Sequence, residues 1–221
     1  MKLLKLSLAA ALAVTVAFAQ ESKSDIGVSA NVAITSNYVW RGMTQTDNSP
    51  AIQGGFDIDY KGIYAGVWGS NINFGDDESS MELDLYVGYS NEIAGLTYDL
   101  GYVQFTYPND SDALNFGEAY LGLSYDFEVV EIGATYYMGV STNDWEDVPD
   151  TIEASVSVPL PYDMSIDATG GNYDTVGTYY SAGVTKTFKS FDFTVAYTGM
   201  DFDDDASDNQ DNVVATISAS F

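Results

Sequence analysis

A strict alternation runs through residues 81–89, which read Met-Glu-Leu-Asp-Leu-Tyr-Val-Gly-Tyr. Apolar side chains take every second position, and acidic, small or hydroxyl-bearing side chains take the positions between them. Successive side chains of a β-strand point to opposite faces, so this pattern predicts a strand with one apolar and one polar face. The same period recurs at 130–138, 152–160 and 213–221, and no helical period is sustained anywhere after residue 19.

Turn signals divide the chain into twelve such segments. The expected strands are 26–41, 50–60, 63–74, 80–90, 95–107, 116–125, 130–140, 151–160, 163–170, 178–188, 191–200 and 212–221. Tight connections at 61–62, 91–94, 126–129, 159–162 and 189–190 alternate with longer polar ones at 42–49, 75–79, 108–115, 141–150, 171–177 and 201–211. Short turns at one end and longer loops at the other are typical of outer-membrane barrels. The sequence therefore predicts an all-β, antiparallel, up-and-down transmembrane β-barrel of about 12 strands.

The N-terminus has the features of an export signal. Lys2 and Lys5 form a short basic region, residues 6–18 are apolar, and Ala17-Phe18-Ala19 fits a small-x-small cleavage site. The alternative is a membrane anchor, but the apolar stretch is short for a span of ~20 residues. We expect a cleaved signal peptide at 1–19 and a single barrel domain at 20–221.

Composition excludes several classes of function. The chain has 33 acidic and 7 basic residues, for a net charge of −26; loss of two lysines with the signal peptide makes it −28. Such a chain would repel phosphate, so we expect no nucleic-acid partner. Cys and His are both absent, which removes disulfides, thiolate metal sites and Ser-His-Asp triads. Barrel hydrolases rely on His, so the sequence predicts no enzyme, no catalytic residue, no metal and no cofactor.

A soluble sandwich shares the alternating pattern, and the positions of the aromatic residues favour a membrane barrel instead. The expected turn-end band holds Tyr60, Tyr89, Tyr125, Tyr162, Phe191 and Phe221, and the expected loop-end band holds Tyr38, Trp40, Phe74, Tyr107, Phe116, Tyr197 and Phe202. Two such bands are typical of interfacial girdles. A terminal Phe221 in register with the apolar face also resembles the signal read by the barrel assembly machinery, an expected partner.

The polar face is expected to line the lumen, because unpaired carboxylates are costly in a dry interior. The predicted pore-lining residues are Arg41, Asp57, Asp59, Glu82, Asp84, Asp99, Glu118, Glu131, Glu153, Asp167 and Asp192. If the alternation of the expected strand 26–41 continues to its end, Arg41 points into the lumen. Two roles stay open for it: the positive side of a constriction, or a rim salt bridge that pins the first loop.

Residues 36–45, which read Ser-Asn-Tyr-Val-Trp-Arg-Gly-Met-Thr-Gln, and 50–54, which read Pro-Ala-Ile-Gln-Gly, resemble the opening of a bacterial family. Residues 62–71, which read Gly-Ile-Tyr-Ala-Gly-Val-Trp-Gly-Ser-Asn, resemble its next strand. The family is that of the TorF-type porins, or Gcw_chp proteins, of the proteobacterial outer membrane. The resemblance covers the whole mature chain and implies a pore in the outer membrane. It supplies no substrate and no catalytic residue.

These observations predict a passive outer-membrane channel for small solutes or ions with an acidic, cation-favouring lumen. A barrel of twelve strands is intermediate in width between small barrels, whose interior is filled by side chains, and large open porins. The bore could be blocked by the inward rings of Tyr86, Tyr120, Tyr137 and Trp68. The alternative is therefore a non-conducting barrel with a structural or surface-contact role.

The long loops are strongly acidic, as in 76–78 and 203–205. They could hold Ca²⁺ or Mg²⁺ and contact lipopolysaccharide, since hard cations prefer carboxylate oxygens. The alternative is a solvated anionic surface. Outer-membrane lipid and lipopolysaccharide are the expected surroundings in either case.

Overall fold

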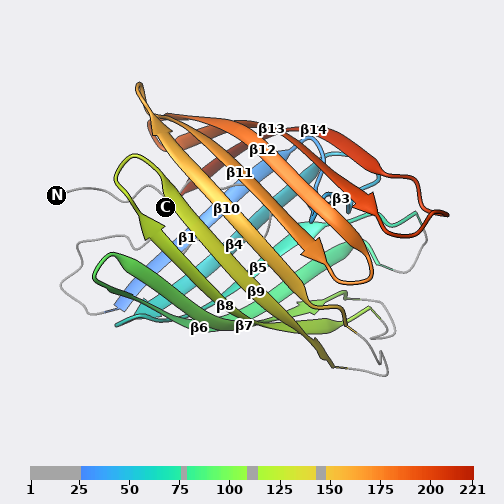
Figure 1. The fold of residues 1–221 in the computed structure, drawn as a ribbon, viewed down its shortest axis with the longest axis horizontal. Helices are drawn as coiled ribbons and strands as arrows, with labels where there is room; N and C mark the ends of the chain where they lie inside the picture. Colours follow the sequence, from blue (N-terminus) through green and yellow to red (C-terminus); the bar gives the residue numbers. More distant parts are fainter. Residues whose placement is uncertain (1–25, 76–78, 109–113, 143–147) are drawn as a thin grey trace.

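The protein forms a closed β-barrel. The computed structural model describes residues 26–75, 79–108, 114–142 and 148–221, so the predicted signal peptide lies outside the described residues. The barrel strands pair antiparallel in the order β1-β14-β13-β12-β11-β10-β9-β8-β7-β6-β5-β4 (Figure 1). They are β1 (Ile26–Thr35), β4 (Ala51–Tyr60), β5 (Ile63–Asn71), β6 (Met81–Ile93), β7 (Leu96–Thr106), β8 (Phe116–Asp126), β9 (Glu131–Ser141), β10 (Thr151–Leu160), β11 (Met164–Tyr173), β12 (Gly177–Phe188), β13 (Phe191–Phe202) and β14 (Gln210–Ser220). The predicted fold class is confirmed.

Tight turns set the pairing of neighbouring strands. Lys61 and Gly62, with φ of 51° and 89°, connect β4 to β5, and Ala94 and Gly95, with φ of 54° and 86°, connect β6 to β7. Two consecutive left-handed residues are the hairpin turn whose twist matches that of the flanking strands. The turn predicted at 91–94 is therefore shorter than expected, and β6 continues to Ile93.

The barrel closes where the first strand meets the last. Asn31 to Thr35 of β1 pair with Thr216 to Ser220 of β14, and Phe221 exchanges backbone hydrogen bonds with Ala30. Because the first and last strands pair, the sheet has no free edge, and the backbone N–H and C=O groups along the paired region are satisfied within the barrel.

The outer face is apolar. Large hydrophobic side chains project outward at every second position of the strands, among them Val28, Ile34, Ile52, Ile58, Leu85, Val87, Leu100, Leu121, Ile132, Ile152, Val184, Val195 and Ile217, all between 42% and 67% exposed. Soluble proteins rarely expose so much contiguous apolar surface. This face needs an apolar environment around the barrel.

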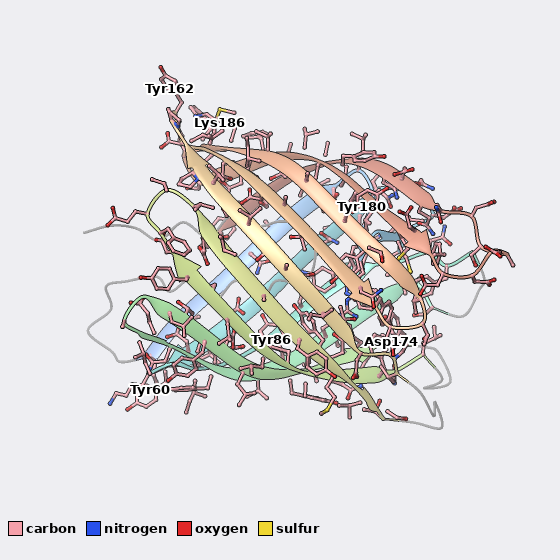
Figure 2. The ribbon with its side chains drawn as sticks, viewed as in Figure 1. Tyr60, Tyr86, Tyr162, Asp174, Tyr180 and Lys186 are labelled. Carbon is pink, nitrogen blue, oxygen red and sulfur yellow. The ribbon has the colours of Figure 1, made fainter. Side chains whose placement is uncertain are left out.

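Of the two predicted aromatic bands, one is confirmed on the outer surface. The turn-end residues Tyr60, Tyr89, Tyr125, Tyr162, Phe191 and Phe221 are all exposed, and Figure 2 shows Tyr60 and Tyr162 at the same end of the barrel. The loop-end band is wrong for five of its members, one of which is Phe202, packed against the inward cluster of Tyr173, Tyr179 and Met200. Tyr38, Tyr107 and Phe116 are buried, and Trp40 packs with them inside the barrel. Phe74 and Tyr197 do face outward at that end.

The loop predicted at 171–177 is also wrong, because β11 runs on to Tyr173 and the connection is only 174–176. Gly171, which reads as a turn residue, pairs with Tyr179 of β12. A Cβ on Gly171 would lie 2.4 Å from the Tyr179 ring, so the glycine makes room for a tyrosine that crosses its position. Glycine marks a close approach here and not a turn.

The first strand ends earlier than predicted. β1 stops at Thr35, and the chain then folds into the barrel as a small hairpin of β2 (Val39–Trp40) and β3 (Met43–Thr44). Its two turn residues, Arg41 and Gly42, have φ of 46° and 79°, which no extended strand can adopt. We call residues 36–49 the inner loop; Figure 1 shows its strand β3 near the loop end of the barrel. Among the described residues, no helix is long and apolar enough to cross a membrane.

Candidate functional site: an acidic lumen and an inner loop

The inner loop is held together by its own side chains. Gln45 donates its backbone N–H to the Tyr38 carbonyl at 2.7 Å, and Thr46 Oγ1 donates to Asn37 Oδ1 at 3.0 Å. Tyr38 in turn donates its backbone N–H to Thr46 Oγ1 at 3.1 Å. Because Asn37, Tyr38 and Thr46 are all buried, the hairpin is a packed element of the barrel interior.

The inner loop contacts separate walls of the barrel. The Tyr38 hydroxyl donates to Glu82 Oε1 on β6 at 2.9 Å. On the other side, Thr44 donates its backbone N–H to Gln210 Oε1 on β14 at 2.9 Å. Strands β6 and β14 are separated in the barrel by β1, β4 and β5. The inner loop therefore crosses the lumen at the loop end.

Arg41 is the centre of this arrangement. Its Nη1 and Nη2 donate to Glu118 Oε1 and Oε2 on β8 at 2.6 and 2.8 Å, a bidentate pair that is almost fully buried. The guanidinium also lies over the rings of Tyr137 and Tyr173, at 5.0 and 4.9 Å from their centroids. Burial alone would lower the pKa of Arg41, but the Glu118 carboxylate outweighs burial and raises it. Arg41 is a fixed charge at every physiological pH.

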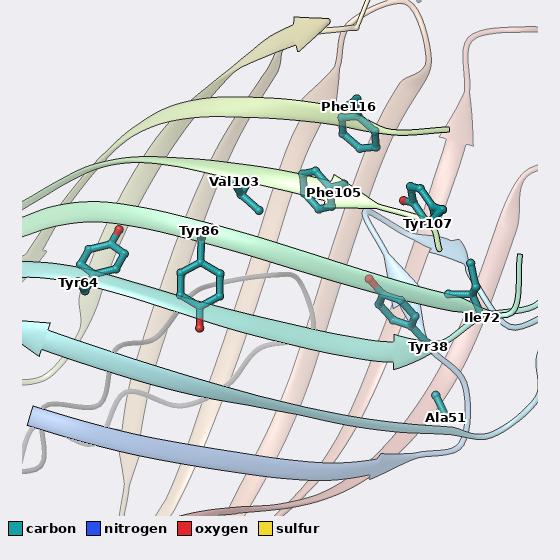
Figure 3. Packing of buried hydrophobic residues seen from close by; sticks show 9 residues of the cluster. All are labelled: Tyr38, Ala51, Tyr64, Ile72, Tyr86, Val103, Phe105, Tyr107 and Phe116. Atoms are coloured by element: carbon teal, nitrogen blue, oxygen red, sulfur yellow. The ribbon is translucent and has the colours of Figure 1, made fainter. Parts of the chain in front are cut away.

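Aromatic rings fill the space between the inner loop and the wall. Trp40 meets Phe105 of β7 edge to face at 5.8 Å and Tyr173 of β11 at 5.7 Å. Phe105 stacks on Phe116 of β8 at 4.5 Å, and Figure 3 shows these two rings side by side. These rings pack beside the buried Arg41–Glu118 ion pair and lower the local dielectric constant, which strengthens it.

Further along the lumen, tyrosines bind the predicted acids. Tyr64 donates to Asp99 at 2.6 Å, and Tyr179 donates to Glu153 at 2.7 Å. Tyr86 donates to Asp57, and Tyr64 and Tyr120 join through their hydroxyls. Figure 3 shows Tyr64 and Tyr86 on neighbouring strands of this cluster.

The opposite wall is built from smaller residues. The inward positions of β10 to β14 include Ser155, Ser157, Thr169, Ser181, Gly183, Thr194, Ala196, Thr216 and Ser218. The bulky inward rings Tyr64, Trp68, Tyr86, Tyr120 and Tyr137 come from β5, β6, β8 and β9. The lumen wall is therefore asymmetric: apart from the inward cluster of Tyr173, Tyr179 and Met200, β10–β14 carry mostly small inward side chains.

The structure places all eleven predicted pore-lining residues on the lumen side. Arg41, Glu82, Asp84 and Glu118 come together at the loop end and are buried. Asp57, Asp99 and Glu153 lie in the tyrosine network. Asp167 accepts from Ser157 and Ser165 at 2.7 and 2.8 Å, and Asp192 accepts from Thr187 at 2.6 Å. Asp59 and Glu131, near the turns, are half-buried. That these side chains line a conducting path stays a prediction.

Sequence reasoning missed the inner loop and therefore its anchors Asn37, Tyr38 and Gln210. The available signal was the Arg41-Gly42 pair, which has the form of a hairpin turn inside an expected strand. Of the two roles left open for Arg41, the geometry shows an ion pair that holds the first loop, although within the lumen and not on a strand at its rim. The acidic run 76–78 lies outside the described residues.

Comparison with known proteins agrees with this geometry. The profile of a family described as "Bacterial protein of unknown function (Gcw_chp)" matches residues 19–221, which confirms that part of the resemblance; the TorF name and a proteobacterial origin stay predictions. A search of curated protein sequences gives no match.

Three solved outer-membrane barrels share the fold. The KdgM porin has a TM-score of 0.60 at 8% identity, over 87% of this chain and 98% of that one. The NanC porin has a TM-score of 0.58 at 13% identity, over 88% and 99%. Outer membrane phospholipase A from Escherichia coli has a TM-score of 0.57 at 14% identity, over 90% and 94%. KdgM is also known in complex with disordered oligogalacturonate. At these identities the likeness concerns the fold.

Proposed function

Because the chain belongs to the Gcw_chp family of bacterial proteins, whose function is unknown, we propose a function from its own barrel. We propose that it is an outer-membrane channel for passive diffusion of small cations and small neutral solutes, narrowed at the loop end by the inner loop. The apolar outer face and the turn-end aromatic band support the membrane location. The predicted signal peptide and the terminal Phe221 support export and assembly there.

The charge of the lumen carries this proposal. Ten acidic side chains point inward from the strands, and within the described part of the chain Arg41 is the one base that reaches the lumen. Glu118 already neutralises it. Carboxylates enclosed by low-dielectric walls concentrate cations and repel anions. A polyanion such as the oligogalacturonate seen with KdgM is an unsuitable solute for this lumen.

The second candidate function is a closed barrel with a structural or surface-contact role. The inner loop and the tyrosine network favour it, because both occupy space that a solute would need. The asymmetry of the lumen wall favours conduction instead, since small inward side chains on β10–β14 occupy less of the bore than the rings on β5–β9.

Enzymatic activity is not part of the proposal, although one fold neighbour is named as a phospholipase. A hydroxyl nucleophile needs an adjacent general base, and the chain has Ser and Thr but no His to act as that base. We therefore expect no phospholipid hydrolysis by the purified protein.

A liposome-swelling assay separates the two candidates. The assay measures the swelling rate of proteoliposomes in three isotonic solutions: arabinose, potassium gluconate and the potassium salt of a trigalacturonate. Swelling reports that the solute passes through the barrel. The channel predicts swelling with the small neutral sugar and none with the trigalacturonate. Absence of swelling with every solute, for a barrel that is folded by heat-modifiability, would support the closed barrel.

A further inference from the structure

One buried carboxylate in the lumen has no hydrogen-bond donor of its own. Asp84 of β6 points inward with 0% exposure, and within the described residues no N–H or O–H group donates to it; the side chain that its carboxylate meets is another acid, Glu82. The neighbours of Asp84 in register are Trp68 on β5 and Phe105 on β7, which offer it aromatic rings. A buried carboxylate without a donor is costly when ionised, so either a proton or a cation must compensate it.

The described residues supply no free positive charge there. Glu82, two residues away on the same face, is also buried, and one of its oxygens accepts from Tyr38. Arg41 gives both guanidinium nitrogens to Glu118. Among the described residues, the charged groups facing this space are Glu82, Asp84, Glu118 and Arg41, with an excess of two negative charges when all three carboxyls are ionised.

We propose that Glu82 and Asp84 bind a small hard cation, of the class of Ca²⁺, between the β6 wall and the inner loop. Hard cations prefer carboxylate oxygens, and Ca²⁺ accepts irregular sets of six to eight oxygens that include water and neutral groups. Within the described residues no three acidic side chains form a preformed metal site, so the protein contributes two carboxylates and water completes the shell. A divalent ion balances the excess charge.

The cation also connects the wall to the inner loop. The Tyr38 hydroxyl donates to Glu82 at 2.9 Å, so an ion that fixes Glu82 also fixes the first turn of the inner loop. Tyr38 packs on Trp68, the neighbour of Asp84, with ring centroids 5.5 Å apart. Binding of the ion therefore stabilises the inner loop in its inward position. This inference rests on the geometry of β6 and the inner loop, and it holds whether or not the barrel conducts.

The test uses the purified mature protein in a non-ionic detergent, stripped with chelator, at pH 8. Calorimetric titration with Ca²⁺ measures binding, and circular dichroism measures the unfolding midpoint with and without Ca²⁺. The variant is Asp84→Asn, and the matched control is Asp192→Asn, another inward acid, which already accepts a hydrogen bond from Thr187 near the turn end. Glu82→Gln is the second variant should Asp84→Asn fail to fold.

The wild type should show a tight binding step and a midpoint that rises with Ca²⁺, as linkage requires for a ligand of the folded state. Asp84→Asn should lose that step, while Asp192→Asn keeps it. Without Ca²⁺, Asp84→Asn should unfold at a higher temperature than the wild type, because an unpaired buried charge has been removed. Saturating Ca²⁺ should reduce or reverse this difference.

Two results would overturn the proposal. If Ca²⁺ leaves the wild-type midpoint unchanged at pH 8, the two carboxyls are neutralised by protons and bind no metal. If Asp84→Asn and Glu82→Gln keep the tight step, the ion binds to the acidic loops. Neither readout depends on conductance, so failure here is distinguishable from failure of the channel proposal.

Discussion

At the scale of single residues, Arg41 makes a bidentate ion pair with Glu118 inside the barrel. The ion pair with Glu118 is buried on both sides, so removal of one partner leaves the other charge without compensation. We expect Arg41→Ala to lower the free energy of unfolding by about 3–5 kcal/mol. Denaturant unfolding of the barrel in detergent measures this loss.

The double variant Arg41→Met with Glu118→Met is the control for that prediction. It removes both charges and keeps apolar volume, so it should recover most of the stability that Arg41→Ala loses. Equal losses in the two variants would mean that the space around Trp40 is wet, against the packing described above.

Residue-level prediction from sequence succeeded where period and charge were sufficient. The inward direction of Asp57, Glu82, Asp84 and Glu118 follows from alternation along their strands. It failed for Tyr38 and Phe116, which alternation and position at a strand end assigned to an outer girdle. Whether an aromatic ring faces lipid or packs on an inward-folded loop depends on a contact between distant segments, and local pattern does not contain it.

At the scale of elements, the turn at Arg41 and Gly42 decides whether the inner loop fits. Gly42 has a φ of 79°, and a Cβ there would lie 2.1 Å from the backbone oxygen of Gly199 on β13. We expect Gly42→Ala to displace the inner loop from the wall while the barrel stays folded. Limited trypsin digestion measures this, because Arg41 is buried in the wild type and becomes a cleavage site when the loop leaves the lumen.

Gly75→Ala is the matched control. Gly75 has a similar φ of 83°, but apart from its chain neighbours no atom of the described residues lies within 4 Å of its would-be Cβ. The control therefore introduces the same backbone strain without the clash. Cleavage after Arg41 in both variants, or in neither, would contradict the role given to the close approach at Gly199.

Removal of the inner loop tests its role as the constriction. Replacement of residues 36–49 by a short Gly-Ser linker leaves the twelve barrel strands and the β1–β4 pairing intact. We expect the single-channel conductance to rise several-fold, because the aromatic and ionic contacts across the lumen are gone. An unchanged conductance would place the narrowest point elsewhere, in the network of Tyr64 and Tyr120.

The elements themselves were largely predictable. Eleven of the twelve expected strands correspond to barrel strands with boundaries shifted by a few residues, because alternation and turn residues are local signals. The exception at 26–41 contains a strand and half of an inward hairpin. The assignment of Gly171 to a turn is wrong. The sequence alone does not distinguish a glycine that makes room for the Tyr179 ring from a glycine that forms a turn.

At the scale of the whole molecule, an apolar outer face surrounds an acidic interior. The mature protein should stay folded only in detergent or lipid, because the exposed apolar side chains around the barrel need a hydrocarbon environment. Sedimentation after removal of detergent measures this. A native, monodisperse barrel in plain buffer would contradict the membrane location.

The reversal potential in a planar lipid bilayer measures whether the lumen prefers cations. With KCl more concentrated on one side, current through the wild-type barrel should reverse at a potential of the sign set by K⁺ permeation, since the lumen carries ten inward acids and one neutralised arginine. Replacement of the half-buried Asp59 and Glu131 by Asn and Gln should move that potential toward zero. A reversal potential of the opposite sign, or no current over many insertions of either the wild type or the protein without its inner loop, would contradict a cation channel.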